Sequence, residues 1–223
     1  MKLSNSRLIE TALTIFQKDF LISVRNPAAF ITMLMFALTS TAILSLSLGL
    51  ADFDEKLLSA LLWIILFFAA SSGISGTFDT ESISGTLPTL KLYAPPQAIL
   101  FGKIFFVIAS LILLAIFIVP IFFILFDCAV KKIFLFTLTI LLGIIGMATA
   151  GTLISALTVS ASIKGGLFSV LLFPIILPIF FPAIKLTELA LQTSEINFEF
   201  LIVIIFYDAV LLLVSSILYD YID

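Results

Sequence analysis

Few residues in this chain are able to carry chemistry. It contains no histidine and one cysteine, Cys128, so it lacks the commonest proton shuttle and metal ligand, and an internal disulfide or a four-thiolate metal site is excluded. Protease and metalloenzyme centres built on H-E-x-x-H, or on serine with histidine, are excluded for the same reason. The G-x-x-x-x-G-K-[ST] loop that cradles nucleotide phosphates is also missing. We therefore expect a non-catalytic protein, and chemistry that needs a water-soluble catalytic domain would come from a partner chain.

Asp208 is the one ionisable residue deep inside a long apolar run. A bare carboxylate at the centre of a membrane helix costs about 2.5 to 3.5 kcal/mol, so we expect this side chain to be protonated, hydrogen-bonded or facing a partner. The adjacent Tyr207 points elsewhere on a helix, which means that a partner would come from another span or another subunit. A proton site, a subunit contact and a structural hydrogen bond to Ser or Thr all stay open.

Prolines recur every four residues in the fifth apolar run, and each removes a backbone donor and disturbs the carbonyl one turn earlier. They are Pro174, Pro178 and Pro182. Freed carbonyls in a membrane must find partners or line a wet cavity, so the pattern predicts either a bendable helix near a translocation path or a static kink. Just before this run, Lys164, Gly165 and Gly166 predict a tight turn that could act as a hinge or a docking point.

Six long apolar runs determine the fold class. About 20 helical residues cross a hydrocarbon core of about 30 Å, and each run is long enough. The runs are Ala28–Leu50, Leu57–Phe78, Ile104–Phe126, Ile133–Ile163, Gly165–Ile184 and Phe200–Leu218, of which only the last contains a charge. With 62% hydrophobic residues in 223 positions, the sequence predicts an all-α integral membrane protein with six transmembrane helices in one transmembrane domain, 1–223, whose six-helix bundle spans 28–218. Nucleic-acid binding has no support.

Basic residues favour a cytoplasmic location for both ends of the chain. With the N-terminus inside, seven Lys or Arg residues lie in cytoplasmic segments and four lie outside. Lys131 and Lys132 are exceptions, because both fall in an outer loop. The prediction is a multi-pass protein of a bacterial-type inner membrane with cytoplasmic termini.

The segment 1–27 predicts an amphipathic helix on the cytoplasmic membrane surface. Its apolar face would contain Leu8, Ile9, Ala12, Leu13, Phe16, Phe20 and Leu21. Asn26 and Pro27 would then turn the chain into the bilayer. This helix either anchors the chain to lipid or also forms part of a docking surface for a cytoplasmic partner.

The longest cytoplasmic connection, 79–103, predicts a short helix of its own. Ile83, Leu87 and Leu90 recur at i, i+4 and i+7, and Pro95 with Pro96 would stop the helix. In transporters driven by a separate ATPase, such a helix sits in a groove of the nucleotide-binding subunit and carries its motion to the membrane. A connector lying on the lipid headgroups is the alternative.

The fourth apolar run contains the small-xxx-small spacings Gly146/Ala150 and Gly151/Ser155. Such spacings let helix backbones approach closely in membranes. We expect them to form contacts within the bundle, with a homodimer face as the alternative.

The chain resembles the CcmB family, the B-type membrane subunit of the haem exporter complex of cytochrome c maturation. The resemblance covers essentially the full chain and rests on two motifs in the right order. The residues are Asp79, Gly85, Thr86, Leu87, Leu90, Leu92, Pro95 and Lys103, then Lys164, Gly165 and Gly166 with the run 171–178. The family usually has acidic residues where this chain has Ser84 and Pro88, so fewer salt bridges to an ATPase are expected.

The resemblance implies an ABC-2-type permease-like bundle paired with an A-type ABC ATPase, a C-type haem-handling protein and an associated small subunit. The residues of the connection, with Glu81, would couple to the ATPase. The resemblance also implies that ATP would act through the partner and that haem would be a transported or handled ligand. We expect no haem to be bound directly as a cofactor, because a chain without histidine lacks the usual axial ligand. Two alternatives stay open: an ABC exporter permease for a lipid, drug or polysaccharide, and a membrane scaffold that anchors the ATPase.

Overall fold

A computed structural model describes residues 5–48, 54–160, 167–192 and 198–221. In this part of the chain every regular element is a helix, as predicted. The helices are α1 (Asn5–Arg25), α2 (Ala28–Leu48), α3 (Glu55–Ile74), α4 (Asp79–Ile83), α5 (Leu87–Tyr93), α6 (Pro96–Leu125), α7 (Ile133–Ser160), α8 (Leu167–Leu191) and α9 (Phe198–Tyr219). Six of these, α2, α3, α6, α7, α8 and α9, are long and apolar enough to cross a membrane.

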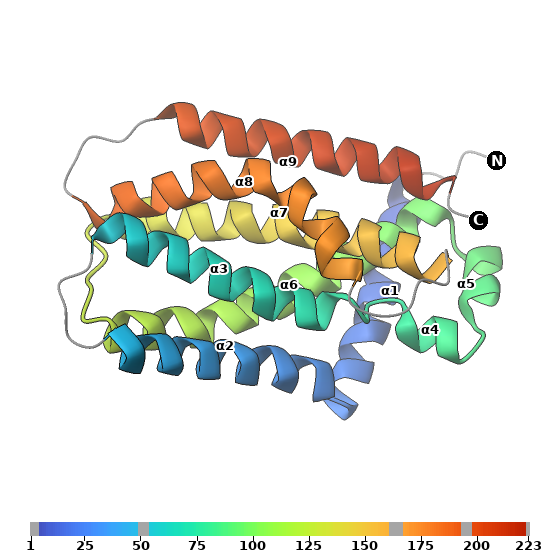
Figure 1. Ribbon diagram of the computed structural model, residues 1–223. Helices are drawn as coiled ribbons and strands as arrows, with labels where there is room; N and C mark the ends of the chain where they lie inside the picture. The colour runs from blue at the N-terminus through green and yellow to red at the C-terminus, as the bar shows by residue number, and fades with distance from the viewer. Residues whose placement is uncertain (1–4, 49–53, 161–166, 193–197, 222–223) are drawn as a thin grey trace.

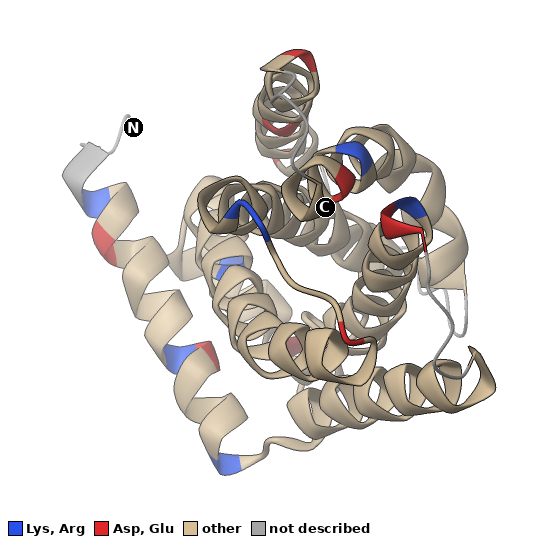
Figure 2. Ribbon diagram, turned by 90° about the vertical axis from the view of Figure 1, so that its left-hand side faces the viewer, with Lys and Arg blue, Asp and Glu red and all other residues tan. Residues whose placement is uncertain are grey.

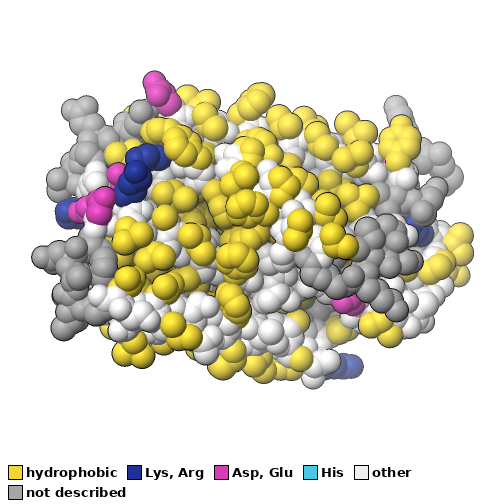
Figure 3. Space-filling model, viewed as in Figure 1, with side chains coloured by type: hydrophobic (Ala, Val, Ile, Leu, Met, Phe, Trp, Pro, Cys, Tyr) yellow, Lys and Arg dark blue, Asp and Glu magenta, His cyan; other side chains and the backbone are white. Residues whose placement is uncertain are grey.

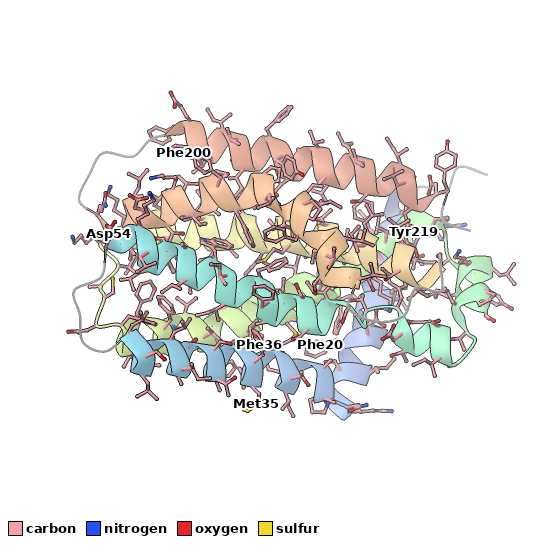
Figure 4. All side chains as sticks on the ribbon, viewed as in Figure 1. Phe20, Met35, Phe36, Asp54, Phe200 and Tyr219 are labelled. Atoms are coloured by element: carbon pink, nitrogen blue, oxygen red, sulfur yellow. The ribbon has the colours of Figure 1, made fainter. Side chains whose placement is uncertain are left out.

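The six spans form an elongated bundle, and α1, α4 and α5 lie together at one end of it, which we call the α1 end (Figure 1). The side chain of Tyr219, near the end of the chain, lies at the α1 end, whereas Asp54 and Phe200 lie at the opposite end (Figure 4). The chain therefore enters and leaves the bundle at the same end, as an even number of spans requires. Charged side chains gather toward the two ends of the face shown in Figure 3, and apolar side chains cover the region between them.

The spans are apolar on all sides because lipid tails are as apolar as the bundle interior. Large side chains such as Ile116, Phe181 and Phe206 are more than 60% exposed on the outside of the bundle. Trp63 and Phe67 of α3 are buried against Phe180 of α8, with ring centroids 6.2 Å and 5.4 Å from that of Phe180. The Trp63 indole Nε1 donates to Thr187 Oγ1 of α8 at 2.9 Å, so the polar atom of the largest core side chain is satisfied.

The small residues of α7 form contacts within the bundle, as expected from their spacing. Gly146, Ala150, Gly151 and Ser155 are all buried. A Cβ atom at Gly151 would lie 2.8 Å from Ile74 of α3, and the Ser155 hydroxyl donates to the Ser75 carbonyl at 3.1 Å. These positions are covered by helices of the same chain, so they do not supply a homodimer face.

Helix α8 continues through all three prolines, and the ribbon bends (Figure 1). Pro174 and Pro178 lie on the exposed side of the helix, whereas Pro182 is buried. The Tyr207 hydroxyl of α9 donates to the Ile175 carbonyl at 2.8 Å. This carbonyl is next to that of Pro174, which loses its helical donor because Pro178 has no N–H, so α9 supplies a donor beside the kink.

The connection between the second and third spans differs from the sequence-based expectation in two ways. Helix α6 begins at Pro96 and not near Ile104, because Pro95 and Pro96 occupy the start of a helix, where a missing N–H is tolerated. The connection forms two short helices and not one, because Gly85 adopts a φ of 67° and turns the chain between α4 and α5.

We predict that Gly143→Ala destabilises the bundle. An added Cβ atom would lie 2.1 Å from Cη2 of the buried Trp63 ring, which its hydrogen bond to Thr187 holds in place. Overpacking of this kind costs about 1 to 3 kcal/mol, which lowers the unfolding midpoint by roughly 2 to 10 °C. Thermal unfolding of the purified protein in detergent measures the shift. Gly76→Ala is the matched control, because the nearest atom to its added Cβ is 3.4 Å away; equal midpoints for the two variants would contradict the prediction.

Candidate functional site

Four charged side chains meet at the α1 end and form an ion cluster, defined here as Lys18, Asp19, Glu81 and Lys103. Lys18 and Asp19 come from α1, Glu81 from α4 and Lys103 from the second turn of α6. Three elements that are distant in the sequence are therefore joined by charge. The cluster contains two cations and two carboxylates, which balances its formal charge.

Lys103 is the centre of the ion cluster and is only 2% exposed. Its Nζ atom lies 2.8 Å from Glu81 Oε1, 3.1 Å from Asp19 Oδ2 and 2.8 Å from the Thr77 carbonyl oxygen. The same ammonium lies 5.1 Å from the centroid of the Phe78 ring, at a distance suited to a cation–π contact. A buried ammonium needs counter-charges and acceptors. Lys103 donates hydrogen bonds to Glu81 and to the Thr77 carbonyl, and its ion pair with Asp19 supplies the second counter-charge.

Lys18 closes the cluster from the more exposed side. Its Nζ atom lies 3.0 Å from Asp19 Oδ1 and also donates to Glu81 Oε1. Burial alone would lower the pKa of Lys18, but the hydrogen bond to Glu81 and the charges of Asp19 and Glu81 outweigh it and raise the pKa. Lys18 is therefore charged at neutral pH.

Close contact between α1 and α6 brings these charges together. A Cβ atom at Gly102 would lie 2.8 Å from the Ala12 carbonyl oxygen and 2.8 Å from Ile15 Cβ, so only glycine permits this approach. Ala12, Ile15 and Asp19 form the buried face of α1. Ile9, Leu13, Phe20 and Leu21 are exposed, and they are the side chains that would face lipid if α1 is the predicted interfacial helix. Figure 2, which looks along the spans, shows α1 lying along one side of the bundle and running across the direction of the spans.

The two faces of the α4–α5 segment differ in their surroundings. Leu87 and Leu90 are partly buried and pack against the apolar cluster that contains Ile15, Phe78 and Tyr219. Ile83, Leu92 and Tyr93 are 87%, 84% and 87% exposed, and α5 extends beyond the spans (Figure 1). A hollow of about 270 Å³ lies beneath α5, lined by residues that include Lys18, Glu81 and Tyr93. We call Ile83, Leu92 and Tyr93 the apolar tip.

The structure brings together only part of the residues singled out from the sequence. Glu81 and Lys103 are paired, Leu87 and Leu90 face inward, and Pro95 precedes α6 as its N-cap. Asp79, Gly85 and Thr86 are exposed around the turn, and Leu92 lies on the apolar tip. Lys164, Gly165 and Gly166 lie outside the described residues.

Sequence reasoning missed Lys18 and Asp19, and placed Lys103 in the connection when it lies inside α6. The signal for Asp19 was its position: with Ala12 and Ile15 it recurs at i, i+3 and i+7 on one helix face. A carboxylate on the buried face of an otherwise apolar stripe indicates a buried cationic partner. Nothing in the spacing identified that partner as a lysine 84 positions later.

Among the described residues, no group of three or more Asp, Glu, Cys or His side chains could hold a metal ion. Met33 and Met147 are buried in the core, and Met35 points away from the bundle (Figure 4). Burial raises the pKa of the Cys128 thiol, with the Glu55 charge adding to the shift, so this cysteine is not an activated thiolate. Asp208 is buried, and neither of its oxygens has a hydrogen-bond partner in the described part of the chain.

We predict that Lys103→Met loosens α1 from the bundle, because Asp19 and Glu81 would share only the partly exposed Lys18. Removing one partner of a buried ion network costs about 3 to 5 kcal/mol. The measurements are the thermal midpoint and the rate of proteolysis within α1. Lys185→Met is the control, since it removes a partly exposed Lys185–Glu188 pair at 2.9 Å whose loss costs about 1 kcal/mol or less. A midpoint for Lys103→Met no lower than that of the control would contradict the prediction.

The chain was compared with models of known protein families and with curated proteins. The model described as CcmB protein matches residues 10–218, which run from α1 to the last turn of α9 and include the ion cluster, the apolar tip and Asp208. None of the curated proteins matches the chain. Because the family match extends over nearly the whole chain and agrees with the six spans, this protein belongs to the CcmB family, which implies a membrane subunit of the haem-export ABC system in cytochrome c maturation.

Proposed function

We propose that this chain couples ATP hydrolysis by a partner ATPase to a rearrangement of its membrane spans. The family match supports a subunit of this class. The single observation that carries the coupling role is the ion pair that joins the α4–α5 segment to a membrane span at the α1 end. There, a segment with an exposed apolar tip is tied through Glu81 to a buried ammonium of a membrane span. A push on the segment would reach α6 through the Glu81–Lys103 pair. It would reach α1 through the Lys18–Glu81 and Lys103–Asp19 pairs.

The apolar tip is the docking face in this proposal. Ile83, Leu92 and Tyr93 belong to a short segment beyond the spans, so lipid tails would not cover them. Three large apolar side chains this exposed on one short segment would fit a groove of a protein partner. Leu87 and Leu90 then act as the inner contact that transmits the motion. The sequence-based expectation named Leu87, Leu90 and Leu92 together as coupling residues, and this proposal divides them between an inner contact and the docking face.

Coupling requires two arrangements of the spans that the ATPase binds with different affinity. ATP binding would close the ATPase, press on α4 and α5, and shift α6 and α1 together, because the ion cluster joins them. The kinked α8 would absorb part of the shift. The α1 end is cytoplasmic in this proposal, in an inner membrane, as the distribution of Lys and Arg favours.

The handled ligand is haem, following the family. The shift would either export haem or release a haem-loaded chaperone assembled by a C-type haem-handling subunit with its small associated subunit. Haem would act here as cargo, and the ATP would stay on the A-type subunit.

We predict that the double variant Leu92→Asp with Tyr93→Asp loses the ATPase. The charges would have to be buried in the docking groove, which reduces co-purification of the ATPase from native membranes by about tenfold or more, equivalent to about 1.4 kcal/mol or more. Leu92→Met with Tyr93→Phe is the matched control and should retain the ATPase. Membrane fractionation confirms insertion of both variants; undiminished co-purification with the double Asp variant would disprove the docking face.

We also predict that replacing Pro174 and Pro178 with leucine reduces the yield of mature cytochrome c. Both prolines lie on the exposed side of α8, so the change straightens the helix without filling the core. Holocytochrome content of membranes measures the effect at matched levels of the subunit. A normal yield would favour a static scaffold over a moving helix.

A further inference from the structure

The Asp208 carboxyl belongs to the middle of a helix that is long enough to cross a membrane. It is the eleventh of the 22 residues of α9, so about ten residues, or roughly 15 Å of helix, separate it from either end. That distance corresponds to the middle of a hydrocarbon core of about 30 Å. The residue is only 5% exposed, so its side chain faces the bundle and not the lipid.

The carboxyl occupies space that a glycine leaves on α7. A Cβ atom at Gly146 would lie 2.5 Å from Asp208 Oδ1, and 2.3 Å from Ile179 Cδ1 of α8. The carboxyl is therefore enclosed between α7 and α8 by packing that leaves no room for a larger residue at position 146. Neither oxygen has a hydrogen-bond partner in the part of the chain that the structure describes.

The helices packed against α9 offer no charge to this carboxyl. Helix α7 contains no ionisable residue. Lys185 and Glu188 of α8 pair with each other at 2.9 Å, two turns beyond Ile179. Lys103 of α6 belongs to the ion cluster. On α9 itself, Glu199 lies nine residues away, and the adjacent Tyr207 donates its hydroxyl to the Ile175 carbonyl.

We propose that Asp208 is a proton-binding site within the membrane, occupied when α9 packs on α7. An ionised carboxylate without a donor or a counter-charge does not persist at this depth, whereas a neutral carboxylic acid does. Release of the proton requires the carboxylate to reach water or a cation, and therefore requires α9 to leave Gly146. Proton binding and the α7–α9 contact are linked, and each favours the other.

Helix α9 connects this site to the ion cluster. Tyr219, at its last turn, is 3% exposed, and its ring centroid lies 6.1 Å from that of Phe78. Phe78 in turn lies beneath the Lys103 ammonium. A displacement of α9 would thus reach the cluster through two aromatic rings. The proton site itself does not depend on the ATPase coupling proposed above, and its test uses no ATPase.

The test compares the thermal midpoints of the full-length wild type and Asp208→Asn in lipid nanodiscs between pH 5 and pH 9. Raising the pH favours unfolding if the folded protein holds a proton that the unfolded chain releases. We expect the wild-type midpoint, relative to that of the isosteric variant, to fall by about 3 °C or more over this range. Glu199→Gln, at an exposed carboxyl of the same helix, should follow the wild type. A relative midpoint that stays constant or rises with pH would overturn the proposal, and a rise would indicate an ionised carboxylate held by a cation.

A second measurement reads the protonation state directly. Dicyclohexylcarbodiimide reacts with protonated carboxylic acids in apolar surroundings, and peptide mass spectrometry locates the adduct. We expect labelling at Asp208 that decreases as the pH rises and is absent in Asp208→Asn. Labelling confined to other carboxyls at every pH would count against a neutral acid at this position.

Discussion

The buried ammonium of Lys103 is the interaction on which the α1 end depends. A cation that is 2% exposed must have counter-charges, and the two carboxylates that supply them belong to α1 and α4. Their need to meet one lysine fixes the crossing of α1 over α6 and the position of α4. The glycine at position 102 makes that crossing sterically feasible, so charge and close packing act at the same point.

The remainder of the bundle follows from the absence of water in the bilayer. Polar groups there must be satisfied by the protein itself, and several are satisfied between helices. Trp63 donates to Thr187, Ser155 to the Ser75 carbonyl, and Tyr207 to a carbonyl at the α8 kink. Because the hydrophobic effect does not drive helices together in lipid, these bonds and the small residues of α7 provide the specificity of packing. The buried hydroxyls of Ser71, Thr152 and Ser215 and the Asp208 carboxyl have no hydrogen-bond partner among the described residues. Asp208 carries a functional inference because, unlike these hydroxyls, it can gain or lose a charge at neutral pH.

The α1 end combines two properties. Its inner side is tied by ion pairs and aromatic rings, whereas its outer side presents the apolar tip over a hollow. A segment that is anchored on one side and unpacked on the other can transmit a push to the spans without unfolding. Membership in the CcmB family supplies the setting for such a device, a membrane subunit that works with the other components of an ABC system.

The sequence by itself determined the class of the protein, because hydrophobic length is a local property that tertiary contacts cannot change. The six spans, the amphipathic α1 and the missing catalytic groups were all readable from residue types and periodicity, and the motifs of the connection indicated the family. The tertiary structure alone decided which charges meet. The pairing of Asp19 with Lys103, the inward direction of Leu87 and Leu90, and the isolation of Asp208 depend on the crossing of helices that are far apart in the chain. Periodicity within one helix shows which face is special but not which residue of another helix will cover it.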